Sequence, residues 1–243
     1  MRVTFKLDNT IQVFRLGKTT NKKITNGDKL VQTYTFSADQ FNYIKNGIDL
    51  NKKPIFKEFF ALDAQNCFDC PFSVNANQGG KCYTHKVMQY SGFVSMLKSI
   101  VKEFENGLDS IPTFSEVTEK IIKMSTNRYV RFGTYGEPSM HPIELVTSMA
   151  NVAKSWTGYT HQYMRKPQYN KFFMASTHNQ LQANTARDKF GYRSFIAVKD
   201  NSSITGIICP ASNEAGFKSN CADCGLCSGM VGKGKKDVVI LEH

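Results

Sequence analysis

The sequence predicts an α/β protein built around a parallel sheet, arranged as a full or partial parallel (β/α) barrel. Two observations favour this class. From residue 129 onward, short apolar segments of strand length are separated by amphipathic segments of helix length, an order typical of parallel strands joined by crossover helices. The 243 residues are 41% hydrophobic and 12% aromatic, which is enough apolar material to form a core and argues against wholesale disorder.

The first fifty residues are predicted to be rich in β structure. Three segments alternate apolar and polar residues with period two, namely residues 2–7, 11–16 and 31–36. Ser37 is placed to cap a short helix over residues 38–46. We therefore expect a small β-rich N-terminal extension over residues 1–56 and a barrel-like core over residues 57–243.

The core is expected to begin with a strand over residues 58–62, a short apolar run. Two helices should follow, over residues 84–106 and 113–125; in the first, apolar residues recur every three or four positions. The remaining elements are expected in this order: strand 129–132, helix 142–155, strands 159–162 and 172–175, helix 180–190, and strands 195–198, 206–208 and 238–241. This number of strands is too large for a small doubly wound unit.

The sequence does not indicate a membrane protein. No stretch approaches the roughly 18 to 20 uncharged apolar residues of a membrane helix, and the opening MRVTFKLDNT lacks the apolar region of a secretory signal. We therefore expect a cytoplasmic protein with no membrane association. The seven cysteines are an odd number, which does not suggest a disulfide framework in such a protein. We interpret them as metal ligands.

The cysteines fall into two groups, each following an expected strand. The first group is Cys67, Cys70 and Cys82, and the second is Cys209, Cys221, Cys224 and Cys227. Successive spacings of two residues wrap a chain around an iron–sulfur cluster. Four thiolates complete either a [4Fe–4S] site or a structural zinc site. Three thiolates leave one metal position open, as a reactive centre requires.

The place of Cys209 leaves two assignments open. Read along the chain, it belongs with the C-terminal cysteines and completes their site. In a closed barrel, however, the first and last strands are neighbours. Cys209 would then complete the site of Cys67, Cys70 and Cys82, and the C-terminal trio would be the open one.

Polar side chains follow several of the expected strands. Glu137 lies in a Gly-Glu-Pro segment after the first of them, and His161 and His178 follow two later ones. Pro138 disfavours helical backbone at Glu137, which fixes this carboxylate at a strand end where it can accept hydrogen bonds from a cationic amino group. Because function gathers at the carboxyl ends of parallel strands, we expect one mouth lined by a carboxylate, two imidazoles and hydroxyl groups such as that of Ser176.

With these motifs, residues 58–243 resemble the radical S-adenosylmethionine (SAM) superfamily, and more closely a set of phage-encoded cysteine-rich proteins. The resemblance implies a partial parallel barrel, one or two [4Fe–4S] clusters and S-adenosylmethionine as a cofactor. For a phage protein it places the chain in the host cytoplasm. The implied metal ligands are the seven cysteines, with zinc as the alternative at the C-terminal group. The implied cofactor-binding residues are Gly136, Glu137 and Ser176, and the implied catalytic residues are Glu137, His161 and His178.

The sequence departs from the superfamily in its cluster loop. The usual loop is C-x3-C-x2-C, whereas Cys67, Cys70 and Cys82 give C-x2-C-x11-C. Tyr135 also stands where the superfamily has a glycine before Gly136. The fold and iron–sulfur binding can therefore carry over without the SAM chemistry.

The net charge supplies an alternative function. Lys and Arg total 31 against 20 acidic residues, a formal charge of +11, which suggests an anionic partner such as DNA or RNA. Aromatic and basic residues are interleaved over residues 159–169, where bases would stack beside cationic side chains. The alternative is a non-catalytic nucleic-acid-binding protein that uses its metal sites as structural clips.

Overall fold

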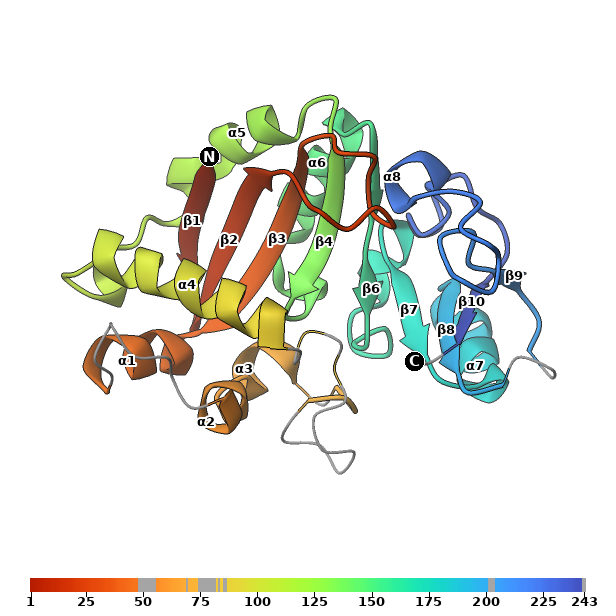
Figure 1. The fold of residues 1–243 in the computed structure, drawn as a ribbon, viewed down its shortest axis with the longest axis horizontal. Helices are drawn as coiled ribbons and strands as arrows, with labels where there is room; N and C mark the ends of the chain where they lie inside the picture. Colours follow the sequence, from red (N-terminus) through yellow and green to blue (C-terminus); the bar gives the residue numbers. More distant parts are fainter. Residues whose placement is uncertain are drawn as a thin grey trace.

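The computed structural model of the chain describes residues 1–47, 56–68, 70–73, 82, 84, 87–200 and 204–241. Its strands form two five-stranded sheets, in the orders β1-β2-β3-β4-β5 and β6-β7-β8-β10-β9 (Figure 1). The expected α/β class with parallel strands is confirmed. Among the described residues both sheets are open, with β1 and β9 at outer edges, so of the two expected alternatives, a full or a partial barrel, the full barrel is wrong.

The first sheet joins the N-terminal strands to the core. Its strands are β1 (Arg2–Leu7), β2 (Thr10–Gly17), β3 (Leu30–Ser37), β4 (Tyr129–Tyr135) and β5 (Ser155–Thr157). The pairs β1–β2 and β2–β3 are antiparallel, and β3–β4 and β4–β5 are parallel. Every residue of β3 is buried, because both faces of the strand are covered. The N-terminal strands, expected as a separate extension, therefore belong to the central sheet.

The second sheet is parallel throughout. Its strands are β6 (Tyr159–Thr160), β7 (Met174–Thr177), β8 (Ser194–Val198), β9 (Ile207–Ile208) and β10 (Val238–Leu241). They lie within two residues of the expected positions. The carboxyl ends of β6, β7 and β8 consequently share one edge of this sheet.

The longer helices cover the faces of the sheets. They are α1 (Ala38–Asn46), α4 (Val87–Glu103), α5 (Phe114–Ser125), α6 (Ile143–Val152) and α7 (Gln180–Phe190). One hydrophobic cluster packs α5 and α6 against the first sheet, and another packs α1 and α4 against its opposite side. Figure 1 shows α4 crossing one face of this sheet while α6 lies behind it. No helix in the described ranges is long and apolar enough to cross a membrane.

The expected strand over residues 58–62 is wrong, because this segment forms helix α2 (Phe56–Ala61). The reason lies in two adjacent phenylalanines. Consecutive residues of a strand point to opposite faces, yet Phe59 and Phe60 are both fully buried in the same cluster. Each ring lies 5.7 Å from the ring of Tyr90. The first cysteine group therefore follows helix α2 and begins at the last residue of a second short helix, α3 (Ala64–Cys67).

Candidate functional site

Three of the predicted site residues lie together at the carboxyl ends of parallel strands. Glu137 follows β4, His161 follows β6 and His178 follows β7. The imidazole rings of the two histidines are stacked, with centroids 5.7 Å apart. The backbone N–H of His161 donates a hydrogen bond to the Glu137 carboxylate at 3.1 Å. The structure thus brings these three predicted residues together at the strand ends.

The first cysteine group is a cluster of three partly buried thiols. Burial raises the pKa of Cys67 well above its usual value, and the negative charges of Asp63, Cys70 and Cys82 raise it further. Burial also raises the pKa of Cys70 to about 12, with the charge of Cys82 adding to the effect. The backbone N–H of Cys82 donates to the carbonyl of Phe72 at 3.1 Å, which closes the loop. The three thiols are therefore close enough for the charge of one to raise the pKa of another.

The cysteine loop is docked on the strand ends. The ring of Phe72 contacts both imidazoles edge-on, with centroids 4.6 Å from His178 and 6.3 Å from His161. The backbone N–H of Glu137 donates to the carbonyl of Asn66 at 2.7 Å. We call this assembly the three-cysteine site; its members are Asp63, Cys67, Cys70, Phe72, Cys82, Glu137, His161 and His178.

Glu137 is held almost entirely by the protein. Only 4% of its surface is exposed, and this burial raises the pKa of its carboxyl group. The carboxylate accepts hydrogen bonds from the backbone N–H and the hydroxyl of Ser139, at 3.1 and 2.9 Å, and from the N–H of His161. The Thr160 hydroxyl is a fourth donor. A carboxylate has about four lone-pair positions, and these four donors fill them. We therefore interpret Glu137 as a positioning residue that joins the ends of β4 and β6.

The other two predicted cofactor-binding residues are Gly136 and Ser176. Gly136 lies next to Glu137 with φ +79°, and a Cβ there would come within 2.8 Å of the Thr35 carbonyl oxygen. Its need for glycine is therefore explained by packing against β3. Ser176 lies inside β7, because this strand continues two residues beyond the expected end. It precedes His178 by two residues.

The second cysteine group gathers all four of its members. Burial raises the pKa of Cys227, and the charges of Cys209, Cys221 and Cys224 add to this effect. Burial likewise raises the pKa of Cys221 to about 11, and Cys209 and Cys224 again contribute. Cys209 therefore belongs with the C-terminal cysteines, and the alternative that joined it to Cys67 is wrong. The sheets are open, so β9 is an outer strand and not a neighbour of the first strands.

This four-cysteine site, defined as Cys209, Cys221, Cys224 and Cys227, lies against the amino ends of β5 and β6, and its Cys209 directly follows β9. The hydroxyl of Tyr159, the first residue of β6, donates a hydrogen bond to the Cys227 sulfur. The hydroxyl of Ser155, the first residue of β5, donates to the Ala222 carbonyl at 2.9 Å. In Figure 1, α8 (Cys221–Cys224) and α3 lie at opposite ends of β4. Helix α3, which carries Cys67, and helix α8, which carries Cys221 and Cys224, are thus at opposite ends of this strand.

No family model, curated protein or solved structure gives a significant match to this chain. The assignment of the two sites therefore depends on their own chemistry. Among the residues that the structure describes, no group of three or more His, Cys, Asp or Glu side chains is already spaced as a metal site.

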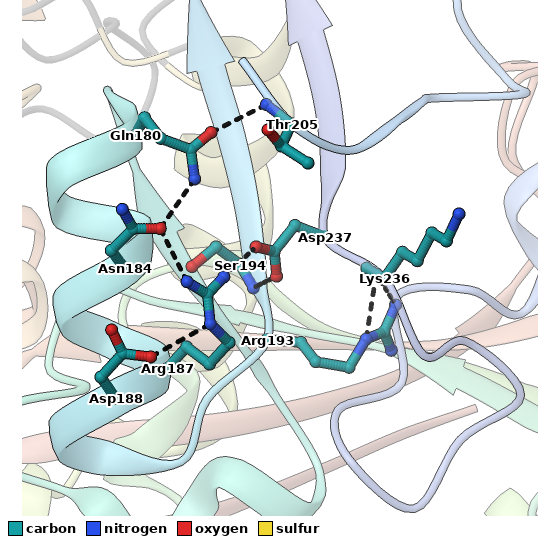
Figure 2. A network of polar contacts seen from close by, with 9 residues as sticks. All are labelled: Gln180, Asn184, Arg187, Asp188, Arg193, Ser194, Thr205, Lys236 and Asp237. Atoms are coloured by element: carbon teal, nitrogen blue, oxygen red, sulfur yellow. Dashed lines mark hydrogen bonds and ion pairs between the residues drawn. The ribbon is translucent and has the colours of Figure 1, made fainter.

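Sequence reasoning missed the residue that holds the loop of the four-cysteine site. Arg193 is 4% exposed, and its guanidinium donates hydrogen bonds to the carbonyls of Leu226, Gly229 and Lys236, each at 3.0 Å. Figure 2 shows Arg193 beside Lys236, within a polar network that also joins Asp237 to the backbone N–H of Ser194 at 2.7 Å. The signal in the sequence was the position of Arg193 just before the apolar strand 195–198, where a side chain is often buried.

Two of the three tyrosines in the predicted stacking segment of residues 159–169 are not available to stack with bases. Tyr163 and Tyr169 are 7% and 4% exposed and belong to the main hydrophobic cluster. The Tyr169 hydroxyl donates to the His141 carbonyl at 2.6 Å. Since these rings are used in the core, bases cannot stack on them.

Proposed function

We propose that this protein is an iron–sulfur protein with two thiolate centres, and that the three-cysteine site is the reactive one. The observation that carries the proposal is the position of three partly buried thiols beside Glu137, His161 and His178 at the carboxyl ends of parallel strands. Active sites of α/β proteins occur at this edge. The four-cysteine site contacts the first residues of β5 and β6, at the opposite ends of those strands, where structural roles are usual.

Charge favours a cation at the three-cysteine site. Asp63 and Glu137 are both buried there, at 0% and 4% exposure, next to three thiols. Deprotonation of all these groups without a cation would place several negative charges in a poorly solvated space, and that is why burial and mutual repulsion raise the thiol pKa values. A metal centre would compensate this charge and release the thiol protons on binding.

The number of thiols distinguishes the two sites. Four cysteines complete the coordination of a [4Fe–4S] cluster or of zinc, and the clamp of Arg193 suits such a structural centre. Three cysteines leave one position open. When bound there, a [4Fe–4S] cluster would supply one electron and an iron with a free coordination position.

S-adenosylmethionine is the cosubstrate that we propose for the open position. The chain order of cysteine loop, Gly-Glu-Pro segment and second cysteine group resembles the radical SAM superfamily, and a partial barrel of that kind is part of the proposal. The chain's own residues would exclude water and position groups. Phe72 covers the two imidazoles, which can hold or transfer a proton. Glu137 fixes His161 through its backbone.

Iron and acid-labile sulfide analysis of anaerobically prepared protein tests the proposal. We would compare the wild type with one variant carrying Cys67→Ser, Cys70→Ser and Cys82→Ser, and with another carrying Cys209→Ser, Cys221→Ser, Cys224→Ser and Cys227→Ser. Each variant serves as the matched control for the other. The wild type should contain iron and sulfide in equal amounts, and the triple variant should lose one four-iron cluster.

The remaining metal of the triple variant identifies the second centre. Iron with sulfide would indicate a second cluster, and one zinc per chain would indicate the structural alternative. A colourless wild-type protein with stoichiometric zinc and no iron would refute the iron–sulfur assignment.

A further inference from the structure

A second region of the molecule has the features of an anion site. A cavity of about 730 Å³ lies between the loop that joins β2 to β3 and the segment that precedes α8. Its volume falls within the roughly 300–1,000 Å³ of ordinary small-molecule sites. It lies next to the four-cysteine site and at the opposite end of the strands from the three-cysteine site.

The cavity is electropositive. Its walls include the ammonium groups of Lys22, Lys23 and Lys218, all on exposed residues. One carboxylate, that of Asp223, also lines it and accepts a hydrogen bond from the Asn220 amide at 2.5 Å. Three positive charges against one negative charge leave a net attraction for anions. The other lining side chains are mostly amides and hydroxyls that can donate hydrogen bonds.

An aromatic ring stands among these charges. Phe217 is 50% exposed although it is a large apolar residue. Its backbone has φ +51°, a left-handed conformation that is unusual for a phenylalanine. The ammonium of Lys23 lies 5.0 Å from the centre of the ring, a cation–π distance. Core packing does not account for this exposed ring, which lines the cavity.

The two walls of the cavity are fixed to one another. The backbone N–H of Cys221 donates to the Lys23 carbonyl at 2.9 Å, and that of Ala222 donates to the Ile24 carbonyl at 3.0 Å. Ile24 is buried against these residues. The lysines of the loop are therefore presented from a backbone that is already anchored.

We propose that this cavity binds a nucleotide unit of single-stranded nucleic acid, with the phosphate among the three lysines and the base stacked on Phe217. Phosphate contacts by lysine and base contacts by an aromatic ring are the two components of single-strand binding. The net charge of +11 favours the same class of partner. The site is separate from the proposed iron–sulfur chemistry and extends the function beyond it.

Fluorescence anisotropy with a labelled oligothymidylate tests this site on the full chain. The variant combines Lys22→Ala, Lys23→Ala and Lys218→Ala. Its matched control combines Lys102→Ala, Lys120→Ala and Lys123→Ala, three exposed lysines on α4 and α5 that remove the same charge elsewhere. We expect the cavity variant to bind at least about tenfold more weakly at low salt, and its slope of log affinity against log salt to fall by about 2. The control should stay within about twofold of the wild type.

Two further measurements test the role of the Phe217 ring and the source of the bound phosphate. Phe217→Asn suits the left-handed backbone and should weaken binding at least about fivefold by removing the stacking surface. Unlabelled thymidine monophosphate and unlabelled oligothymidylate are then compared as competitors at equal nucleotide concentration. Equal competition would show that a free nucleotide is enough to fill the site, whereas competition by the oligonucleotide alone would show that the site requires the polymer. Equal weakening by the control triple variant, no effect of Phe217→Asn, or no salt-sensitive binding at micromolar protein would overturn the proposal.

Discussion

Replacement of Glu137 by glutamine separates a positioning role from a ligand-binding role. Gln has the same shape but only one acceptor oxygen, so its NH2 group must face either the N–H of His161 or the donors of Ser139. One buried donor then loses its partner. In addition, the remaining hydrogen bonds lose the assistance of the negative charge.

The magnitude follows from the observed contacts. The His161 hydrogen bond to the carboxylate measures 3.1 Å, and the two from Ser139 measure 3.1 and 2.9 Å. A hydrogen bond to a charged group contributes about 1.5–3 kcal/mol, and a neutral one about 1 kcal/mol. Loss of one bond and weakening of the others therefore destabilises the protein by about 3 kcal/mol. For a chain of this size that corresponds to a fall in Tm of about 6–12 °C.

Urea unfolding followed by the fluorescence of the single Trp measures this change at pH 7.5. Glu119→Gln, on the exposed side of α5, is the control and should change the free energy of unfolding by less than about 0.5 kcal/mol. Glu137→Gln should also lower metal content at the three-cysteine site more than at the four-cysteine site. Unchanged stability would refute the positioning role and return Glu137 to the ligand-binding role expected from the sequence.

Substitutions at three other positions, with Gly92→Ala as a contrast, test the framework around the sites. Arg193→Met leaves three buried or partly buried carbonyls without their donor and should cost about 3–4 kcal/mol in urea unfolding; a loss under 1 kcal/mol would contradict the clamp. Gly136→Ala should cost at least about 2 kcal/mol, because φ is +79° and Thr35 backbone blocks the Cβ, whereas Gly92→Ala, with open space in α4, should stabilise the protein by about 0.5–1 kcal/mol. Burial lowers the pKa of His141 from 6.5 to about 3, so the folded state binds fewer protons than the unfolded state below pH 6.5. Wild-type stability should fall by about 1.4 kcal/mol per pH unit between about pH 6 and 4, and His141→Gln should remove this component; identical pH profiles of the two proteins would be the contrary result.

The sequence predicted most elements because their patterns were local. The bounds of α1, α7 and β10 are as expected, since caps and periodicity are written in neighbouring residues. Helix α2 was mistaken for a strand because a run of adjacent apolar residues has no helical period. Only the tertiary contact with Tyr90 shows that Phe59 and Phe60 share one layer.

The site was predictable where it followed strand ends. His161 and His178 come together because β6 and β7 are parallel neighbours, and this follows from topology alone. The filled carboxylate of Glu137 and the clamp of Arg193 depend on donors and acceptors from distant segments. Those contacts could not be derived from spacing along the chain.

The parallel pairing of β3 with β4 was also outside the reach of local patterns. The segment 31–36 reads as part of a hairpin meander, and nothing near it indicates that it pairs with a strand about one hundred residues later. This pairing places the N-terminal strands in the central sheet and brings Thr35 against the Gly-Glu-Pro segment. The division expected at residue 56 came from reading the first strands by themselves.

Electron paramagnetic resonance of the reduced protein tests the central claim most directly. The protein is prepared anaerobically with Cys209→Ser, Cys221→Ser, Cys224→Ser and Cys227→Ser, so that only the three-cysteine site can hold a cluster. We predict an iron–sulfur signal that shifts when S-adenosylmethionine is added. The shift is expected because the amino and carboxylate groups of S-adenosylmethionine would bind the iron that has no cysteine ligand. A protein that gives no such signal, or one whose signal is identical with and without S-adenosylmethionine, would contradict a reactive centre at the carboxyl ends of these strands.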